Sequence, residues 1–305
     1  MNEFQSGDVI CFLGDSITAN GLWEAEIFQT LKKRIDVKCL NRGASGSRAD
    51  IVVDYLDEFC LSKNPTHVSI AFGVNDIDRY ACTQEYQATH NDGEQVVERA
   101  IENYAKHMEK IVCECLKKGA KPILCTPIPY DEYSDSEEEN LRCDYALEKC
   151  AQIVKTLAKK YRCKVVDFRK NLLPLVKNNG LIVADRIHPT DKGCHYMAQI
   201  YLREIGEIER ADFETPFVFE KWNKLRFDVE TKVKMLDFIE RVVIWNQRKT
   251  LGWGLEETIL EVQNRIAQDV DKKEYMTGCY ETYLQYANHR EELENELNRL
   301  TDVVK

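Results

Sequence analysis

Five short apolar runs recur along the first two-thirds of the chain, and each of them ends in a turn. They occupy residues 9–13, 37–40, 67–72, 123–126 and 164–168. Nearly continuous apolar runs of this length are typical of buried parallel strands, because helices cover such strands on both faces and leave neither face exposed to solvent. Between the runs, apolar residues recur at helical spacing near 20–35, 48–61, 95–118, 140–161 and 190–206. The alternation predicts an α/β fold with three α/β/α layers and a five-stranded parallel sheet.

Beyond about residue 210 the pattern changes. Gly and Pro become rare, strand-like runs disappear, and helical spacing appears near 226–248, 255–272 and 279–304. The sequence therefore predicts a domain over 1–210 and a helical C-terminal unit over 211–305. Three roles for that unit stay open: it packs on the first domain, forms an interface in a homo-oligomer, or shapes one wall of the functional site.

Two polar stretches are predicted to be loops. Residues 79–95 lack periodicity and are expected to form a long loop over one edge of the sheet, where substrate contacts commonly lie. Residues 131–139 are acidic and are interpreted as a solvated loop that leads into the next helix.

Charge and cysteine content narrow the class of protein. The 305 residues include 42 Lys and Arg against 52 Asp and Glu, a formal net charge of −10. An acidic protein is a poor match for nucleic acid or for anionic membranes, so neither is expected as a partner. The 12 cysteines are scattered and contain no Cys-x-x-Cys pair, which favours small buried side chains in a reducing compartment. Together with an N-terminus that lacks a signal-peptide pattern, this predicts a cytoplasmic protein.

Candidate catalytic residues follow the ends of three predicted strands. Ser16 comes directly after the first run, Gly46 lies in the small-residue turn after the second, and Asn75 follows the third. Because the carboxyl ends of parallel strands meet at one edge of a sheet, we expect these residues to lie together. A serine in such a position acts as a nucleophile when a base and oxyanion donors converge on it.

His188 is the candidate base, because imidazole titrates near neutral pH. Asp185 precedes it by three residues in a predicted loop, and in a turn this spacing can bring the carboxylate to the imidazole. The alternative for the stretch around Ser16 is purely structural, with Asp15 or Ser16 capping the next helix.

Four blocks of the chain together resemble the SGNH (GDSL-type) hydrolases. They are 14–16 (Gly-Asp-Ser), Gly46, 73–76 (Gly-Val-Asn-Asp) and 185–188 (Asp-Arg-Ile-His), and they come in the family's order at the expected strand ends. The resemblance covers roughly residues 7–206 and leaves the helical unit unassigned. It implies a flavodoxin-like SGNH hydrolase fold, a catalytic triad of Ser16, Asp185 and His188, and no metal or cofactor.

The resemblance also implies an oxyanion hole. In the family, the oxyanion accepts from the backbone N–H of the serine, from the backbone N–H of the block-two glycine and from the asparagine amide, here Ser16, Gly46 and Asn75. Gly43 is the competing glycine, but the family's spacing, counted from Asn41, favours Gly46.

Other polar residues near the blocks are expected to have structural roles. Asp15 and Asp76 are expected to position loops, and Ser45 and Ser47 to form turn hydrogen bonds. His195, on the last helix of the domain, is expected to be structural or at the surface.

The function predicted from these residues is a serine esterase that cleaves acyl esters of a small molecule through an acyl-enzyme. Short acyl chains are favoured, with carbohydrate O-acetyl esters as one candidate class. Lysophospholipase, thioesterase and acyltransferase activities use the same site and stay open. A non-catalytic binding or assembly module that works through the helical unit is the alternative from another class.

Overall fold

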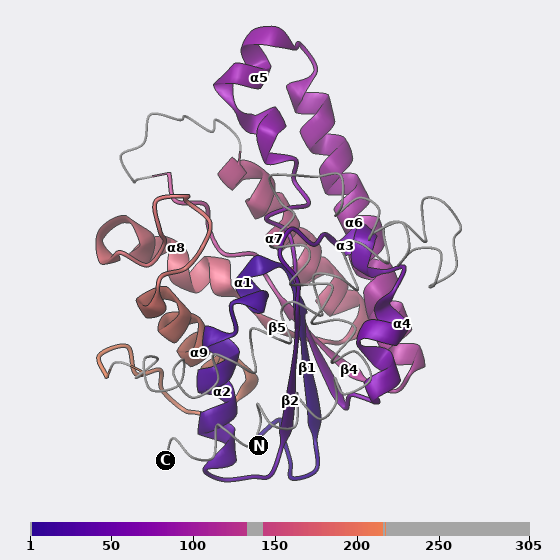
Figure 1. Ribbon diagram of the computed structural model, residues 1–305, viewed down its shortest axis with the longest axis vertical. Coiled ribbons are helices and arrows are strands. Elements are labelled where there is room, and N and C mark those ends of the chain that lie inside the picture. Colours follow the sequence, from indigo (N-terminus) through magenta and orange to yellow (C-terminus); the bar gives the residue numbers. More distant parts are fainter. Residues whose placement is uncertain (1, 133–142, 216, 218–305) are drawn as a thin grey trace, which may run out of the picture. The chain divides into compact units, whose positions relative to one another are not determined.

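The computed structural model describes residues 2–132, 143–215 and 217 (Figure 1). Nearly all of the predicted helical unit over 211–305 lies outside these residues, as does most of the acidic stretch 131–139. The division of the chain at residue 210 and the homo-oligomer interface therefore stay predictions.

The predicted parallel sheet is confirmed, and its strand ends are aligned. The five strands run in the order β2-β1-β3-β4-β5, and every neighbouring pair is parallel. In the sheet register Gly14 lies opposite both Gly43 and Ala71. The first three strands in the sequence therefore end side by side, and their turns open on the same edge of the sheet. The strands are β1 (Val9–Gly14), β2 (Lys38–Gly43), β3 (His67–Ala71), β4 (Lys121–Cys125) and β5 (Lys164–Val166).

Helices cover both faces of this sheet (Figure 1). One layer contains α2 (Leu22–Lys32), α8 (Phe168–Asn179) and α9 (Asp191–Ile205). The other contains α4 (Leu56–Phe59), α6 (Gly93–Lys117) and α7 (Cys143–Tyr161). The fold is thus the three-layer α/β/α arrangement that the apolar pattern predicts.

Helix α6 shows why the pattern works. Its buried residues recur at intervals of three and four, which places them on one face of the helix against the sheet. They include Val97, Ile101, Tyr104, Met108 and Ile111. Gly119 follows the helix with a φ of 80°, a left-handed conformation that ends the helix at low steric cost.

Several element predictions were wrong in detail. The helix expected over 48–61 is three short pieces, α3 (Ala49–Val52), α4 and the 3-10 helix η1 (Leu61–Lys63). The loop expected over 79–95 contains the 3-10 helix η2 (Arg79–Cys82) and α5 (Gln84–Thr89), and α6 starts within it. Both short helices are capped by side chains, of Asp78 and Thr83, and local capping of this kind leaves no apolar period to detect.

The last predicted strand is also shorter than expected. It ends at Val166, and Phe168 begins α8, a helix that the apolar pattern did not indicate. Asp167 caps it by accepting from the backbone of Lys170. Pro174 lies inside the helix, where its ring removes one backbone hydrogen bond, and such a residue is normally a signal against a helix.

Cysteines and helix lengths complete the description. The described cysteines are free thiols, most of them buried, and Cys39 and Cys163 are half-buried. Among the described residues, every helix is too short or too polar to cross a membrane.

Candidate active site

A tight turn carries Ser16 at the end of β1. The strand ends at Gly14, and the short helix α1 (Ser16–Ala19) begins at the serine. A Cβ at Gly14 would lie 2.8 Å from the carbonyl oxygen of Ala71 and 2.2 Å from Thr18 Oγ1, so only glycine fits. Asp15 Oδ1 accepts from the backbone N–H of Ile17 at 2.9 Å. The capping role considered for this stretch therefore belongs to Asp15, and the hydroxyl of Ser16 is left for another partner.

That partner is His188. Ser16 Oγ lies 2.7 Å from His188 Nε2, although the two residues are 172 positions apart. His188 Nδ1 lies 2.5 Å from Asp185 Oδ2. The backbone N–H groups of Ile187 and His188 donate to Asp185 Oδ1 at 3.0 and 2.9 Å. The structure thus brings the three predicted triad residues into one hydrogen-bonded line.

The same contacts keep Asp185 ionised. Partial burial works against the charged form, but the backbone and ring N–H donors of His188 and the backbone of Ile187 outweigh it. They hold the pKa of Asp185 below its usual range. A carboxylate in this state orients the imidazole and stabilises its charged form.

The loop that carries His188 is tied down on both sides. A backbone bridge joins Ile182 to Pro189, and the backbone N–H of Asp131 donates to the carbonyl of Arg186 at 3.0 Å. Thr190 then caps α9 by accepting from the backbone of Gly193. These bonds hold the loop against the segment that follows β4 and against the start of α9.

Backbone and amide donors lie at the ends of β2 and β3. Gly46 has a φ of 74°, and it is exposed in the turn after β2. Asn75 donates through Nδ2 to the carbonyl oxygen of Ser47 at 3.2 Å, which ties the end of β3 to the same turn. Among the described residues, the backbone N–H groups of Ser16 and Gly46 have no hydrogen-bond acceptor. This leaves two backbone donors, and the second N–H of the Asn75 amide, for a ligand.

Gly43, the competing glycine, has a different role. Its N–H already donates to Asn41 Oδ1 at 2.8 Å. A Cβ at Gly43 would lie 2.1 Å from the backbone nitrogen of Ala19, whereas a Cβ at Gly46 would have open space around it. Gly43 is therefore the residue that lets α1 pack against β2, and Gly46 is the one with a free donor.

Two buried carboxyl groups flank the turns. Burial raises the pKa of Asp15 to about 6. Burial also raises the pKa of Asp76 to about 7, with the charge of Asp15 adding to the effect. Asp76 Oδ1 accepts from the backbone N–H of Ala49 at 2.8 Å. Each carboxyl group thus accepts from a backbone N–H next to a strand end and has the loop-positioning contact expected of it.

The remaining candidates have structural contacts. Ser47 Oγ lies 3.2 Å from the hydroxyl of Tyr55, while Ser45 is exposed. His195 is buried, and its Nδ1 lies 2.9 Å from Glu26 Oε2, a contact that joins α9 to α2. Among the described residues, no group of three His, Cys, Asp or Glu side chains is placed to hold a metal ion.

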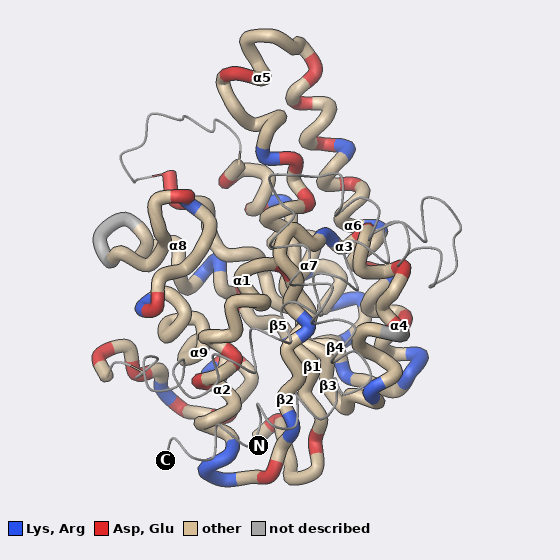
Figure 2. The backbone as a smooth tube through the Cα atoms, viewed as in Figure 1, with Lys and Arg blue, Asp and Glu red and all other residues tan. Residues whose placement is uncertain are grey.

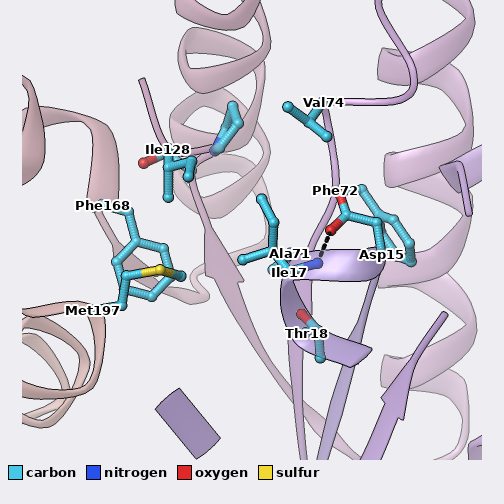
Figure 3. Close-up of a pocket in the computed structure, with 11 residues that line it drawn as sticks. Asp15, Ile17, Thr18, Ala71, Phe72, Val74, Ile128, Phe168 and Met197 are labelled. Carbon is cyan, nitrogen blue, oxygen red and sulfur yellow. Dashed lines mark hydrogen bonds between the residues drawn. The ribbon is translucent and has the colours of Figure 1, made fainter. Parts of the chain in front are cut away.

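Two hollows lie near these residues. The first is small and mostly apolar, about 20 Å³, and it is lined by side chains from α1, β3, α8, α9 and the segments that follow β1, β3 and β4 (Figure 3). Figure 3 shows Asp15 and Ile17 on one side of it and Phe168 and Met197 on the other. This volume holds about one water molecule, so the first hollow has no room for a substrate.

The second hollow is polar and much larger, about 490 Å³. It opens beside Asn75 and Asp76, and Arg48, Arg79 and Tyr80 are among the residues that line it. These three side chains were not among the residues predicted to belong to the site. The only sequence signals were their positions directly after the second and third blocks and in the predicted loop over the sheet edge.

Comparison with known proteins shows which family this arrangement belongs to. The model of the GDSL-like lipase/acylhydrolase family matches residues 10–200. An acetylxylan esterase from Geobacillus stearothermophilus is 26% identical over 223 residues, which cover 66% of this chain and 95% of that protein.

Solved structures share the fold. A crystal structure of an acetylxylan esterase from Geobacillus stearothermophilus has a TM-score of 0.54 and 23% identity, and the match covers 66% of this chain and 95% of that one. A gut microbial diltiazem-metabolizing enzyme has a TM-score of 0.71 and 14% identity, over 99% of this chain and 96% of that one. The chain therefore belongs to the GDSL-like lipase/acylhydrolase family of SGNH hydrolases, and it is a carboxylic ester hydrolase.

Proposed function

We propose that the protein is a serine esterase that hydrolyses short-chain acyl esters through an acyl-enzyme on Ser16. The observation that carries this proposal is the line of contacts from Asp185 through His188 to Ser16 Oγ, with distances of 2.5 and 2.7 Å. A serine hydroxyl is a weak nucleophile until a base accepts its proton. His188 Nε2 is within hydrogen-bond distance of that proton, and Asp185 stabilises the resulting imidazolium.

The reaction then proceeds in two halves. Ser16 Oγ attacks the ester carbonyl while His188 takes its proton, and the carbonyl oxygen becomes an oxyanion. The free backbone N–H groups of Ser16 and Gly46 and the amide of Asn75 stabilise that charge. When the intermediate collapses, His188 gives its proton to the leaving alcohol. Water then attacks the acyl-Ser16 ester by the same route and releases the acid.

The family relatives support a short acyl group. The relative at 26% identity is an acetylxylan esterase, an enzyme named for acetyl esters on a carbohydrate. Crystal structures of the Geobacillus esterase include catalytic mutants in which alanine replaces a serine, an aspartate and a histidine three residues after the aspartate. Asp185 and His188 have the same residue types and the same spacing. Acetyl esters, with carbohydrate O-acetyl esters first among them, are therefore the leading substrates.

The test is an ester panel of graded acyl length, measured with wild type and with Ser16→Ala. We expect wild type to prefer acetyl over longer acyl groups and Ser16→Ala to lose hydrolysis of p-nitrophenyl acetate. Ser6→Ala, at an exposed serine near the N-terminus, is the matched control. Undiminished turnover in Ser16→Ala would rule out this nucleophile. Product analysis with added alcohol acceptors separates hydrolysis from acyl transfer. Preferential turnover of acyl thioesters or lysophospholipids would show that acetyl esters are not the substrate class.

A further inference from the structure

The polar hollow lies next to the donor proposed for the oxyanion. Asn75 and Asp76 contribute to its wall from the end of β3, Arg48 and Asp50 from the start of α3, and η2 and α6 supply the rest. Asn75 is therefore shared between the hollow and the proposed oxyanion hole. Ser16 and His188 do not line the hollow, so an ester held at Ser16 can reach it only with one of its two halves, past Asn75.

Size and polarity decide which half that is. A volume of about 490 Å³ lies within the range of roughly 300–1,000 Å³ found for small-molecule sites, and an acetyl group would leave it largely empty. A long acyl chain fills space but is a poor match, because it would desolvate arginine and aspartate side chains without replacing their hydrogen bonds. Ala100 is the one aliphatic side chain in the wall that the described residues form. The hollow suits the alcohol half of the ester.

The charges in the wall favour an uncharged alcohol. The wall contains two arginines and three aspartates. Arg48 is already paired with Asp50, through Nε and Nη2 at 3.0 Å each, and Asn103 donates to the same carboxylate at 3.1 Å. Figure 2 shows basic and acidic residues interspersed along α6. A ligand with a charge of either sign meets a like charge here, whereas a hydroxyl can accept from an arginine and donate to an aspartate.

Two side chains of η2 are free to contact such a ligand. The Arg79 guanidinium is half-buried, and its charge acts on the buried carboxyl group of Asp15 without a direct ion pair between the two side chains. Tyr80 is 53% exposed, and its ring makes an edge-on contact with Tyr86, at 5.4 Å between ring centroids. Arginine offers five N–H donors in a fixed plane, and tyrosine offers an apolar face with a hydroxyl at its tip. A sugar ring has the complementary surfaces, with hydroxyls around its rim and C–H groups on its faces.

We propose that the hollow beside Asn75 binds the alcohol half of the substrate, a neutral polyhydroxylated ring such as a sugar, and that Arg79 and Tyr80 determine this specificity. The proposal rests on the proposed esterase function, because it takes Asn75 as the oxyanion donor. Arg79 donates to the ring hydroxyls and Tyr80 stacks on the ring. Neither residue touches the reacting atoms, so both act through binding of the alcohol half.

The experiment compares two acetyl esters that differ in their alcohol. One is a monoacetylated methyl glycoside, and the other is p-nitrophenyl acetate, whose leaving group has no hydroxyls for Arg79. We expect Arg79→Ala and Tyr80→Ala each to lower kcat/KM for the glycoside by at least about 10-fold more than for p-nitrophenyl acetate, mainly through KM. Matched controls are Arg210→Ala, at an exposed arginine after α9, and Tyr145→Ala, at a tyrosine that is 48% exposed on α7.

Three results would overturn the proposal: equal losses on both esters, no loss on either, or preferential turnover by wild type of the corresponding acetylated uronate. A binding measurement separates this from failure of the esterase proposal. In Ser16→Ala, which cannot form the acyl-enzyme, the methyl glycoside itself is titrated and followed by NMR. We expect Arg79→Ala in that background to weaken binding by at least about 10-fold, and unchanged binding would contradict the subsite whatever the nucleophile.

Discussion

At the scale of single residues, neighbouring side chains take over the structural hydrogen bonds and leave the proposed catalytic groups available. Asp15, and not Ser16, caps α1, so the serine hydroxyl is left for His188. Asn41 takes the N–H of Gly43, while the N–H of Gly46 has no acceptor in the described part of the chain. The order of the blocks could be read from the sequence, but which glycine keeps a free donor depends on contacts between β2 and α1. Only the resemblance to the family, and no local pattern, favoured Gly46 beforehand.

Asn75 gives the residue-scale prediction. Asn75→Ala removes a donor that acts mainly on the oxyanion, so kcat should fall by about 10²–10³ while KM changes little. Steady-state kinetics with p-nitrophenyl acetate measure both values. Asn91→Ala, at an exposed asparagine before α6, is the control and should match wild type. A change confined to KM would show that Asn75 binds the ground state and not the oxyanion.

At the scale of elements, two close backbone approaches set the position of the nucleophile. Gly14 lets β1 turn beneath α1, and Gly43 lets α1 lie directly against β2. The apolar pattern predicted the strands well, because buried parallel strands are nearly all apolar. It missed η2, α5 and α8, whose first turns are capped by Asp78, Thr83 and Asp167, and it treated 48–61 as one helix where the chain breaks twice.

Gly43 gives the element-scale prediction. In Gly43→Ala the new Cβ would lie 2.1 Å from the backbone of Ala19, so α1 must move and carry Ser16 away from His188. We expect a loss of at least about 10²-fold in kcat/KM, because a shift of α1 moves Ser16 out of line with His188 and the ester carbonyl. We also expect a lower Tm, because α1 no longer packs against β2.

Gly119→Ala is the matched control for that variant. Gly119 has a φ of 80° and open space around its Cβ position, so the change strains the backbone at the end of α6 without touching α1. It should lower Tm and leave kcat/KM near the wild-type value. Full activity in Gly43→Ala would show that the position of α1 is not set by this contact.

At the scale of the whole molecule, the sheet gathers residues that the chain separates widely. Five parallel strands and their aligned ends follow from the apolar pattern, and the family blocks follow from the resemblance. The polar hollow does not follow from either, because Arg48, Tyr80 and Ala100 come from three different segments that converge only in the folded chain. The burial of Asp15 and Asp76 likewise cannot be read from the sequence, because it depends on how the layers pack.

Those carboxyl groups give a prediction for stability against pH. Burial raises the pKa of Asp76 from 3.8 to about 7, so between these values the folded state binds more protons than the unfolded state. The free energy of unfolding must then fall as pH rises through this range. Asp76→Asn keeps an acceptor for Ala49 and lacks the titration. Its Tm relative to wild type should therefore be higher at pH 8 than at pH 5.

Thermal unfolding of both proteins at the two pH values measures this difference. Asn91→Ala, at an exposed side chain that carries no titratable group, is the surface control and should show no such trend. A relative Tm for Asp76→Asn that is constant or lower at pH 8 would contradict a raised pKa.

The most direct test of the central claim is covalent labelling of the intact protein with a fluorophosphonate, followed by peptide mass spectrometry. If Ser16, His188 and Asp185 form a working triad, one probe per chain should attach to Ser16, hydrolysis of p-nitrophenyl acetate should be lost in step with labelling, and Ser16→Ala should take up no probe. An inert protein that works only as a binding module would stay unlabelled. Labelling of another residue, or hydrolysis that survives full labelling of Ser16, would contradict the assignment of Ser16 as the nucleophile.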